Sequence, residues 1–423
     1  MKNSYKWVLL ALLAGGLFFH QADRALFGLL TIPIQDELGL SDVQIGWINT
    51  ALSWTLAGMA LIAGPVGDRF SRKWIITVSL MAWSFMTFMM GYVGDWRIFG
   101  FTVPAFFTVM FFRSIATGVG ESFFGPCYPP LIAAFHRETR SLALSIMQGS
   151  LYFALMASGV LAARALGFLG TWRHVFIAFG AAGFLLGVVF IFTLKDDPTR
   201  VARGTMKGGS LDGFKYFFKT PSAICAMIGF AAIVFVNNAY LFWAPKFMTE
   251  KFGVSVAEAG TQTMLWHHLC AFVAILAGGY LTDRCVRRCP RFRVGFQMLT
   301  MLFGAPCLLS AGFAPSASVF IAMSAAYGIF RGGFEVNTHA SLFDVVPSEY
   351  RSTATGIFIV FAFFVGGLSG IVMGALSQHY GVRGFEFGFA LMAAAYLVGA
   401  AAMLISFFFT FKKDRIAEGT ADE

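Results

Sequence analysis

The chain has 423 residues, of which 57% are apolar and only 13% are charged, and its mean hydropathy is +0.71. Soluble domains carry about 25% charged residues, so this composition excludes a water-soluble globular enzyme, a disordered chain and a disulfide-rich fold. The net charge is +9, and the placement of the basic residues decides what this excess means. The apolar residues form long continuous runs, which are typical of membrane-spanning helices.

Twelve apolar runs, each bounded by charged or turn residues, predict twelve helices. They lie near residues 7–32, 44–66, 74–94, 104–134, 140–166, 174–194, 222–247, 259–282, 293–313, 317–346, 352–377 and 384–411. Most exceed the roughly 20 residues that cross a bilayer. We therefore expect an all-α membrane protein with two six-helix bundles. The expected domains are an N-terminal bundle (1–194), a cytoplasmic linker (195–221), a C-terminal bundle (222–411) and a cytoplasmic tail (412–423).

The basic residues are distributed unequally between the two sides of the predicted bundle. If the chain starts in the cytoplasm, 22 of the 31 Lys and Arg residues fall in inner segments and six in outer loops. Inner loops of membrane proteins carry this excess of positive charge. The pattern predicts cytoplasmic termini in the cell (inner) membrane, and the +9 charge is then a matter of topology, with no nucleic-acid partner expected.

The two halves repeat one pattern. GPVGDRFSRK (64–73) follows the second predicted helix and GGYLTDRCVRR (278–288) follows the eighth, which sets their Asp-Arg pairs 215 residues apart. Arg140 and Arg351, after the fourth and tenth helices, are 211 residues apart. Two features repeated at nearly one spacing indicate internal duplication, as in many secondary transporters.

The repeated Gly-x-x-x-Asp-Arg segment with its basic cluster resembles the signature of the major facilitator superfamily of transporters. The resemblance covers essentially the whole chain and implies a two-bundle fold and a gating role for the inner-face turns. The residues that match are Gly64, Asp68, Arg69, Arg72, Lys73, Gly279, Asp283 and Arg284. The alternative is that these turns only fix the topology and contact headgroups, but that role does not require the acid.

Few of the ionisable residues inside the predicted spans are informative, and the charges of these few balance. They are Asp23, Arg24, Arg113, Glu121, Arg331 and Glu335. A charge at bilayer depth costs a few kcal/mol or more, so such residues face a cavity and pair with one another. A structural ion pair would account for one pair, whereas all three favour a transport site where the two halves meet.

The segment 19–48, with its Asp-Arg pair, and RSIATGVGES (113–122) are similar to two branches of the superfamily. One is the organic anion:cation symporters, which include sugar-acid and sialin-type carriers, and the other is the spinster-like lipid transporters. The resemblance implies that Arg24 binds a substrate anion and that Asp23 and Glu121 carry protons. Neighbours on a helix point about 100° apart, so Asp23 and Arg24 can serve different partners.

The spacing in the fourth helix departs from the family pattern. There the Arg and Glu are separated by seven residues and share a face, whereas Arg113 and Glu121 are separated by eight. On a regular helix this spacing turns the two side chains about 80° apart, unless a bulge intervenes. The role of Arg113 as a substrate contact therefore depends on such a bulge, whereas the role of Glu121 as a proton site does not.

The tenth helix holds a second charged pair. Arg331 and Glu335 are four residues apart, so they can pair on one face. Arg331 is a candidate for a second anionic group of the substrate, Glu335 for a third proton site and Asn337 for a substrate contact. The alternative is a Glu–Arg pair that only stabilises the C-terminal half.

Four further polar residues are candidate ligands for substrate hydroxyls. Gln148 and Tyr152 are one turn apart in the fifth helix, and Asn237 and Asn238 lie toward the outer end of the seventh. Polar residues between membrane helices are also ordinary packing contacts, which is the alternative for each of them.

We expect no metal and no cofactor, with protons as the coupling ion. The six cysteines are scattered and lack the paired spacing of a zinc site. His267 and His268 in the eighth helix lack neighbouring carboxylates, and His20, three residues before Asp23, either modulates that acid or packs between helices.

These residues predict proton-coupled symport of a small organic anion, such as a sugar acid, by a monomer working through alternating access. Burial favours the neutral form of a carboxyl group and a nearby Arg favours the charged form. An anion that displaces Arg24 from an acid would therefore promote protonation of that acid. Spinster-like transport of a lysophospholipid or another amphiphile is the main alternative. A membrane enzyme is disfavoured because no catalytic motif is present, and a channel would lack proton-stimulated accumulation.

Overall fold

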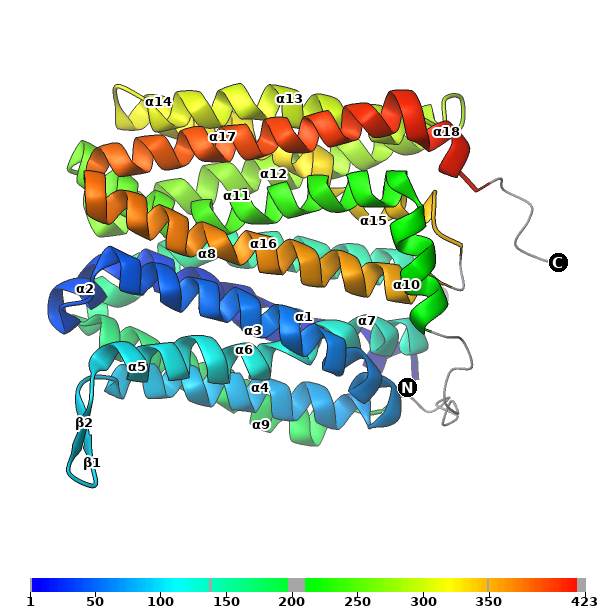
Figure 1. The fold of residues 1–423 in the computed structure, drawn as a ribbon. Coiled ribbons are helices and arrows are strands. Elements are labelled where there is room, and N and C mark those ends of the chain that lie inside the picture. Colours follow the sequence, from blue (N-terminus) through cyan, green and yellow to red (C-terminus); the bar gives the residue numbers. More distant parts are fainter. Residues whose placement is uncertain (1, 137–138, 197–209, 348–349, 417–423) are drawn as a thin grey trace. The chain divides into compact units, whose positions relative to one another are not determined.

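The computed structural model describes residues 2–136, 139–196, 210–347 and 350–416. The chain forms two compact units, which are described separately. The first comprises Met1–Thr205 and Leu241–Leu265, and the second comprises Met206–Tyr240 and Trp266–Glu423. Figure 1 shows that both are built almost entirely from helices.

The N-terminal part of the chain contains nine helices and one hairpin within its described residues. The helices are α1 (Lys2–Leu29), α2 (Thr31–Leu38), α3 (Asp42–Arg69), α4 (Arg72–Met89), α5 (Ala105–Val109), α6 (Thr117–Ser122), α7 (Phe124–Phe135), α8 (Arg140–Leu169) and α9 (Trp172–Thr193). A 3-10 turn follows α4 (Met90–Tyr92), and a π-helical segment joins α5 to α6 (Met110–Ala116). The hairpin consists of β1 (Trp96–Ile98) and β2 (Phe101–Val103).

The C-terminal part of the chain is also built from helices. Its helices are α10 (Ser210–Lys219), α11 (Pro221–Phe252), α12 (Val256–Val286), α13 (Phe292–Gly312), α14 (Ala317–Glu335), α15 (Thr338–Phe343), α16 (Arg351–Tyr380), α17 (Val382–Ile405) and α18 (Phe411–Asp414). A second π-helical segment, Ser406–Thr410, joins α17 to α18. Helices α11 and α12 each contribute residues to both units.

The expectation of a mostly helical protein with many candidate membrane spans is confirmed. Ten helices of the described residues are long and apolar enough to cross a membrane. The predicted spans near 7–32 and 104–134 correspond to α1 and to the α5–α7 region, which are not among these ten. The α5–α7 region is divided into shorter helical segments. The number twelve and the cytoplasmic position of the termini remain predictions.

Helix packing repeats between the units, in line with the duplication of the sequence. In the first unit α4 packs along α9 and against α6, and in the second α13 packs along α17 and against α14. Helices α4 and α9 correspond to the third and sixth of the expected helices, and α13 and α17 correspond to the ninth and twelfth. Figure 1 shows α13 beside α17. Gly180 explains the close approach of α9 to α4, because a Cβ there would lie 2.3 Å from the backbone nitrogen of Phe88.

Local signals end and restart the helices at short turns. Gly39 ends α2 with φ of 63°, a conformation that glycine adopts without strain. Ser41 then caps α3, since its hydroxyl accepts from the Gln44 N–H while the Gln44 side chain accepts from the Ser41 N–H. Gly170 and Thr171 end α8 and cap α9 in the same way. Each turn reverses the chain within a few residues.

The sequence did not predict the hairpin. Its two-residue turn, Phe99 and Gly100, has positive φ at both positions (49° and 85°), as a type I′ turn requires. Such turns usually carry Asn or Asp before the glycine, and a phenylalanine gives no such signal.

The expected linker, 195–221, contains one helix. Residues 197–209 lie outside the described part, but α10 occupies most of the remainder and packs against α16. Gly213 makes this contact close, because a Cβ there would lie 3.1 Å from the Thr353 side chain.

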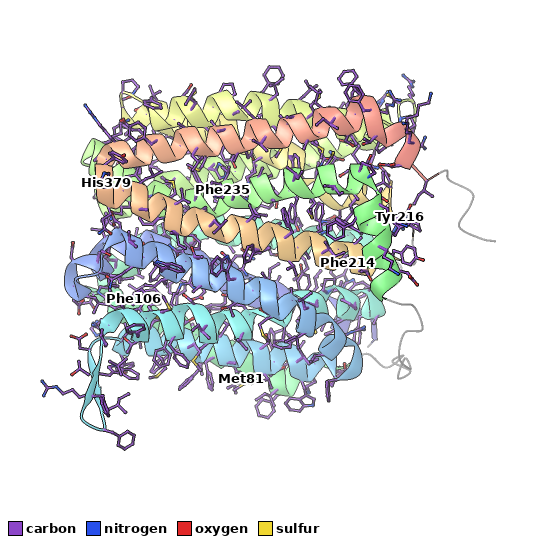
Figure 2. All side chains as sticks on the ribbon, in the orientation of Figure 1. Met81, Phe106, Phe214, Tyr216, Phe235 and His379 are labelled. Atoms are coloured by element: carbon purple, nitrogen blue, oxygen red, sulfur yellow. The ribbon has the colours of Figure 1, made fainter. Side chains whose placement is uncertain are left out.

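The core of the first unit brings α1, α4 and α7 together. Leu13, Trp83 and Phe124 have at most 1% of their surfaces exposed and belong to one apolar cluster. Outward-facing positions are also apolar, as at Phe192, which is 81% exposed. Exposed apolar surface of this extent is typical of lipid-facing helices, and Figure 2 shows how many side chains project from the ribbon. Helix α1, which contributes to this apolar core, also carries the charged residues Asp23 and Arg24.

Candidate functional site

Arg24 on α1 pairs with Glu121 on α6. Its Nε donates to Oε2 of Glu121 across 2.8 Å, and the Glu121 side chain has no exposed surface. Within the described part of the chain, the other carboxylate oxygen of Glu121, Oε1, has no hydrogen-bond partner. One oxygen of this buried acid is therefore held by Arg24 and the other is open to a proton.

The neighbouring residue, Asp23, pairs with the other arginine. Nη1 of Arg113 lies 3.4 Å from Oδ2 of Asp23, and the Thr87 hydroxyl on α4 donates to Oδ1 across 2.8 Å. Arg113 also donates to the backbone oxygen of Arg24 across 3.2 Å, and its guanidinium carbon lies 5.4 Å from the Phe27 ring centroid. The two pairs therefore use adjacent residues of α1 for different partners, as the 100° rotation between them predicts.

Arg113 reaches Asp23 from the π-helical segment Met110–Ala116. This segment widens the turn, and the Thr117 hydroxyl donates to the Phe112 oxygen five residues earlier, across 2.7 Å. A π-turn accommodates one extra residue in a helix. The eight-residue separation of Arg113 and Glu121 therefore contains a bulge, and both side chains contact residues of α1.

Two glycines let α6 approach its neighbours. A Cβ on Gly120 would lie 3.0 Å from the backbone nitrogen of Trp83 on α4, and one on Gly118 would lie 2.9 Å from the Thr55 side chain on α3. The Ser79 hydroxyl donates to the oxygen of Gly120 across 2.5 Å. The motif TGVGES thus packs α6 between α3 and α4 and carries Glu121 into the interior.

The four charged side chains differ in exposure. Arg24 is 19% exposed, whereas Glu121, Arg113 and Asp23 are 0%, 2% and 6% exposed. Arg24 is therefore the most exposed of the four.

His20 packs between helices, which is one of its two expected roles, and the acid that it approaches is Glu121. Its Nε2 is 3.8 Å from Oε2 of Glu121, and its ring packs edge-on against Trp83 and parallel to Phe124. His20 and Arg24 are four residues apart and so share a helix face. That spacing was a usable signal that His20 would approach the partner of Arg24.

In the second unit, Arg331 contacts the side chains of Glu335 and His267. Its Nε is 3.4 Å from Oε2 of Glu335, which confirms the local pair, and its Nη1 is 2.9 Å from Nε2 of His267 on α12. Nδ1 of His267 lies 3.0 Å from the backbone oxygen of Ser324. A carbonyl only accepts, so Nδ1 carries a hydrogen, and an Arg only donates, so Nε2 is the acceptor. This geometry requires a neutral His267.

Aromatic residues surround this contact. The His267 ring lies 4.4 Å from the Tyr240 ring and 5.1 Å from the Tyr327 ring, measured between centroids. The Tyr396 hydroxyl donates to that of Tyr327 across 3.0 Å. The sequence did not indicate that His267 would contact Arg331.

Gly328 and Gly332 bring α14 against α12. A Cβ on either glycine would lie 2.3 Å from a backbone oxygen of α12, that of His267 or that of Ala271. This is the small-xxx-small pattern by which membrane helices approach closely. It was a readable signal that the helix carrying Arg331 packs tightly at that position.

The other candidate ligands occupy both units. Gln148 and Tyr152 lie on α8 of the first unit, the former half-buried and the latter fully buried. Asn237 and Asn238 are half-buried on α11 of the second unit. Asn337 follows α14 and donates to the Thr282 hydroxyl across 3.2 Å, which binds it to α12. Its observed role is therefore a packing contact.

The proposed gating residues are described only in part. Gly64 and the side chains of Asp68 and Arg69 lie outside the described part of the structure. The side chains of Arg72 and Lys73 are half-buried, and a Cβ on Gly279 would lie 3.3 Å from the Val336 side chain. Asp283 and Arg284 are exposed at the end of α12, where Arg284 donates to the Tyr280 hydroxyl across 3.4 Å. This exposure is compatible with gating and with headgroup contact alike.

Buried charges on packed apolar helices indicate a functional site inside a membrane protein, and the family comparison gives the class of that protein. The model of the Major Facilitator Superfamily matches residues 13–306 and 247–422. The chain belongs to this superfamily and is a multi-pass membrane transporter. This confirms the resemblance drawn from the duplicated motif.

Two related transporters and one solved structure are similar to the chain over most of its length. The chain is 26% identical to a "Probable galactarate/D-glucarate transporter" of Bacillus subtilis (strain 168), with 85% of this chain and 83% of the relative covered. It is also 26% identical to a "Probable galactarate/D-glucarate transporter" of Escherichia coli (strain K12), with 84% and 85% covered. The crystal structure of a bacterial homolog of the human lysosomal transporter Spinster matches with a TM-score of 0.83, 19% identity and coverage of 98% and 99%. The last match shows the fold.

Proposed function

We propose that this transporter carries a small organic anion, a sugar acid in the first instance, together with protons. The observation that carries the proposal is the Arg24–Glu121 pair at 2.8 Å, with a fully buried acid and a partly exposed base. An incoming carboxylate competes with Glu121 for Arg24, because both are anionic acceptors for one guanidinium.

The same pair accounts for coupling. Once the substrate takes Arg24, Glu121 is a buried carboxylate without its counter-ion, and burial disfavours the charged form. Glu121 then takes up a proton, for which Oε1 is available. Release of the substrate lets Arg24 return to Glu121 and expel the proton. Substrate and proton therefore bind and leave together.

Asp23 is the second proposed proton site, and Arg113 a substrate contact that also serves as its counter-ion. Asp23 accepts from Thr87 and Arg113, so its charged form is better satisfied than that of Glu121. Its protonation would require Arg113 to move toward the substrate. Glu121 is for this reason the primary coupling residue of the proposal.

The substrate class rests on Arg24, on Arg331 and on the relatives. Galactarate and D-glucarate, named for two relatives, are hydroxylated acids with a carboxylate at each end. In the proposal Arg24 binds a carboxylate of the substrate, Arg331 is a candidate for a second anionic group, and Glu335 is a candidate for a third proton site. Gln148, Tyr152, Asn237 and Asn238 are the proposed partners of the hydroxyl groups, and Asn337 stays a candidate for them.

The remaining features of the proposal follow the superfamily. A monomer with twelve spans and cytoplasmic termini works in the cell (inner) membrane by alternating access, and the duplicated Asp-Arg turns regulate the inner gate. The proposed cycle uses protons as the coupling ion and no cofactor.

The test is uptake by purified protein in proteoliposomes with an inward proton gradient. Galactarate and D-glucarate should accumulate above the equilibrium level, and an ionophore that collapses the gradient should abolish the excess. Galactonate, with one carboxylate, and an uncharged hexose serve as comparisons. Failure of every small anion to accumulate with the gradient would remove the proposal.

A spinster-like transport of lysophospholipid is the second candidate, because the matching fold extends over nearly the whole chain. The same vesicles distinguish it. Proton-dependent movement of a lysophospholipid, without uptake of a sugar acid, would favour this candidate.

A further inference from the structure

Helix α10 presents three faces to three different surroundings. At 100° per residue, Gly213, Tyr216 and Phe217 share one side. Phe214 and Phe218 lie about 40° apart on a second side, and Lys215 and Lys219 about 40° apart on a third. The first side is buried to half-buried, and the other two are exposed.

The first side docks on the second unit. Phe217 is fully buried, and the Tyr216 hydroxyl donates to the Val345 oxygen across 3.4 Å. The rings of Tyr216 and Tyr350 lie 5.4 Å apart. Gly213 contacts Thr353, as described above. These contacts fix the rotation of α10, so its exposed residues point in defined directions.

The second side is an apolar ridge. Phe214 and Phe218 are 48% and 47% exposed, and their ring centroids are 4.8 Å apart. Figure 2 labels Phe214 and Tyr216 on this helix. Two large aromatic side chains at neighbouring exposed positions are costly in water, and such a surface marks an interaction site.

Chain connectivity places α10 at the surface of the bilayer. The span of α11 begins at Pro221, two residues after the last residue of α10. The span of α16 begins at Thr353, the residue that Gly213 contacts. Both attachments of α10 are therefore at ends of membrane spans, where hydrocarbon gives way to headgroups.

We propose that α10 is an interfacial helix that binds the surface of a bilayer containing anionic lipids. Phe214 and Phe218 enter the region between headgroups and acyl chains, while Lys215 and Lys219 contact the lipid phosphates. This combination of an apolar ridge and a flanking basic edge is how amphipathic helices lie on membranes. The inference is independent of the transported substrate.

The first experiment measures the depth of single positions in the full-length protein. A nitroxide is attached at Phe214→Cys, or at Asp212→Cys as the matched control on the same helix, after the six native cysteines are replaced. In vesicles with about one third phosphatidylglycerol, the label at 214 should collide more with oxygen than with a water-soluble nickel chelate. The label at 212 should show the reverse. A label at 214 that meets the nickel chelate freely, or that is shielded from both reagents as under a protein partner, overturns the proposal.

The second experiment needs no cysteine replacement. Lys215→Gln/Lys219→Gln is compared with Lys412→Gln/Lys413→Gln, an exposed pair on α18. Phosphatidylglycerol should raise the melting temperature of the wild-type protein relative to phosphatidylcholine alone. The α10 pair should lose at least half of that shift and the α18 pair should keep it. An equal response of the two variants overturns the role of α10.

Discussion

The buried charges of the two units are held in different ways. In the first unit, the two arginines of the site each pair with an acid on another helix: Arg24 with Glu121, 97 residues away, and Arg113 with Asp23, 90 residues away. In the second unit, Arg331 pairs with Glu335 one turn later and with the uncharged His267. The two halves share a helix arrangement but have different electrostatics.

An ion pair between helices and an ion pair within one helix are suited to different roles in transport. A pair between helices breaks when the helices or the ligand move, so it can report substrate binding to a distant acid. A pair within one turn persists when helices move relative to one another, because both partners belong to one rigid helix. We therefore expect coupling to depend on the first unit and the second unit to modulate affinity.

The largest expected effect is that of Arg24→Ala. The variant removes the exposed cation of the first unit, and truncating one member of a buried charge pair costs about 2–5 kcal/mol. Binding of a sugar acid should weaken by at least about 30-fold, measured by calorimetry or by the shift of melting temperature with ligand. Arg24→Lys, which keeps the charge but loses the planar fork, should retain part of the affinity. Normal uptake by Arg24→Ala would end the assignment of this residue.

Glu121→Gln should separate coupling from transport. The amide keeps the shape of the side chain and carries no titratable proton, so accumulation driven by a proton gradient should disappear. Exchange of labelled for unlabelled substrate needs no net proton movement and should continue, without its dependence on pH. Glu335→Gln in the second unit is the matched control, and the comparison predicts that its accumulation is affected less. Loss of coupling in both variants to the same degree would contradict the difference between the units.

Asp23→Asn should mainly affect stability. It leaves the 1%-exposed Arg113 without its carboxylate, and breaking a buried pair from one side costs about 3–5 kcal/mol. The melting temperature of the variant in detergent should fall clearly. Asp23→Asn combined with Arg113→Gln removes both charges and should recover most of it. An Asp23→Asn protein that melts like the wild type would show that this pair is no stronger than the local pair of the second unit.

The smallest expected effect is that of Arg331→Gln, and it should depend on the substrate. Loss of one charged hydrogen bond costs about 1.5–3 kcal/mol. Affinity for galactarate, with two carboxylates, should fall about tenfold or more, while affinity for galactonate should change little. The ratio of the two affinities is the measurement. Equal losses for both acids would leave Arg331 with only a structural role.

Much of the fold was readable from the sequence because membrane helices are defined by long apolar runs. The short elements were less predictable. The hairpin depends on positive φ at Phe99 and Gly100 without the usual Asn or Asp. Helix α10 carries the run FKYFFK (214–219) in a segment whose polar surroundings suggested a linker throughout.

The contacts of the candidate site also include some that the sequence predicts and some that it does not. The Arg331–Glu335 pair follows from a spacing of four, which is a local property. The choice of partner for Arg24 and Arg113 is tertiary, because Asp23 and Arg24 are adjacent and either arginine could have met either acid. Thr87 and His267 carry no charge in this geometry, so the charge inventory of the sequence could not single them out.

The π-helical turn at Met110–Ala116 has a consequence for how this helix changes during evolution. A π-turn is a one-residue insertion that a helix has absorbed without moving its two ends. Loss of one residue there would leave a regular α-helix with the Arg and the acid seven residues apart and still on one side. An alignment of such helices would show a single gap between them, while the three-dimensional positions of the two charges stay the same. Conserved geometry in this helix is therefore better recognised by side-chain direction than by residue count.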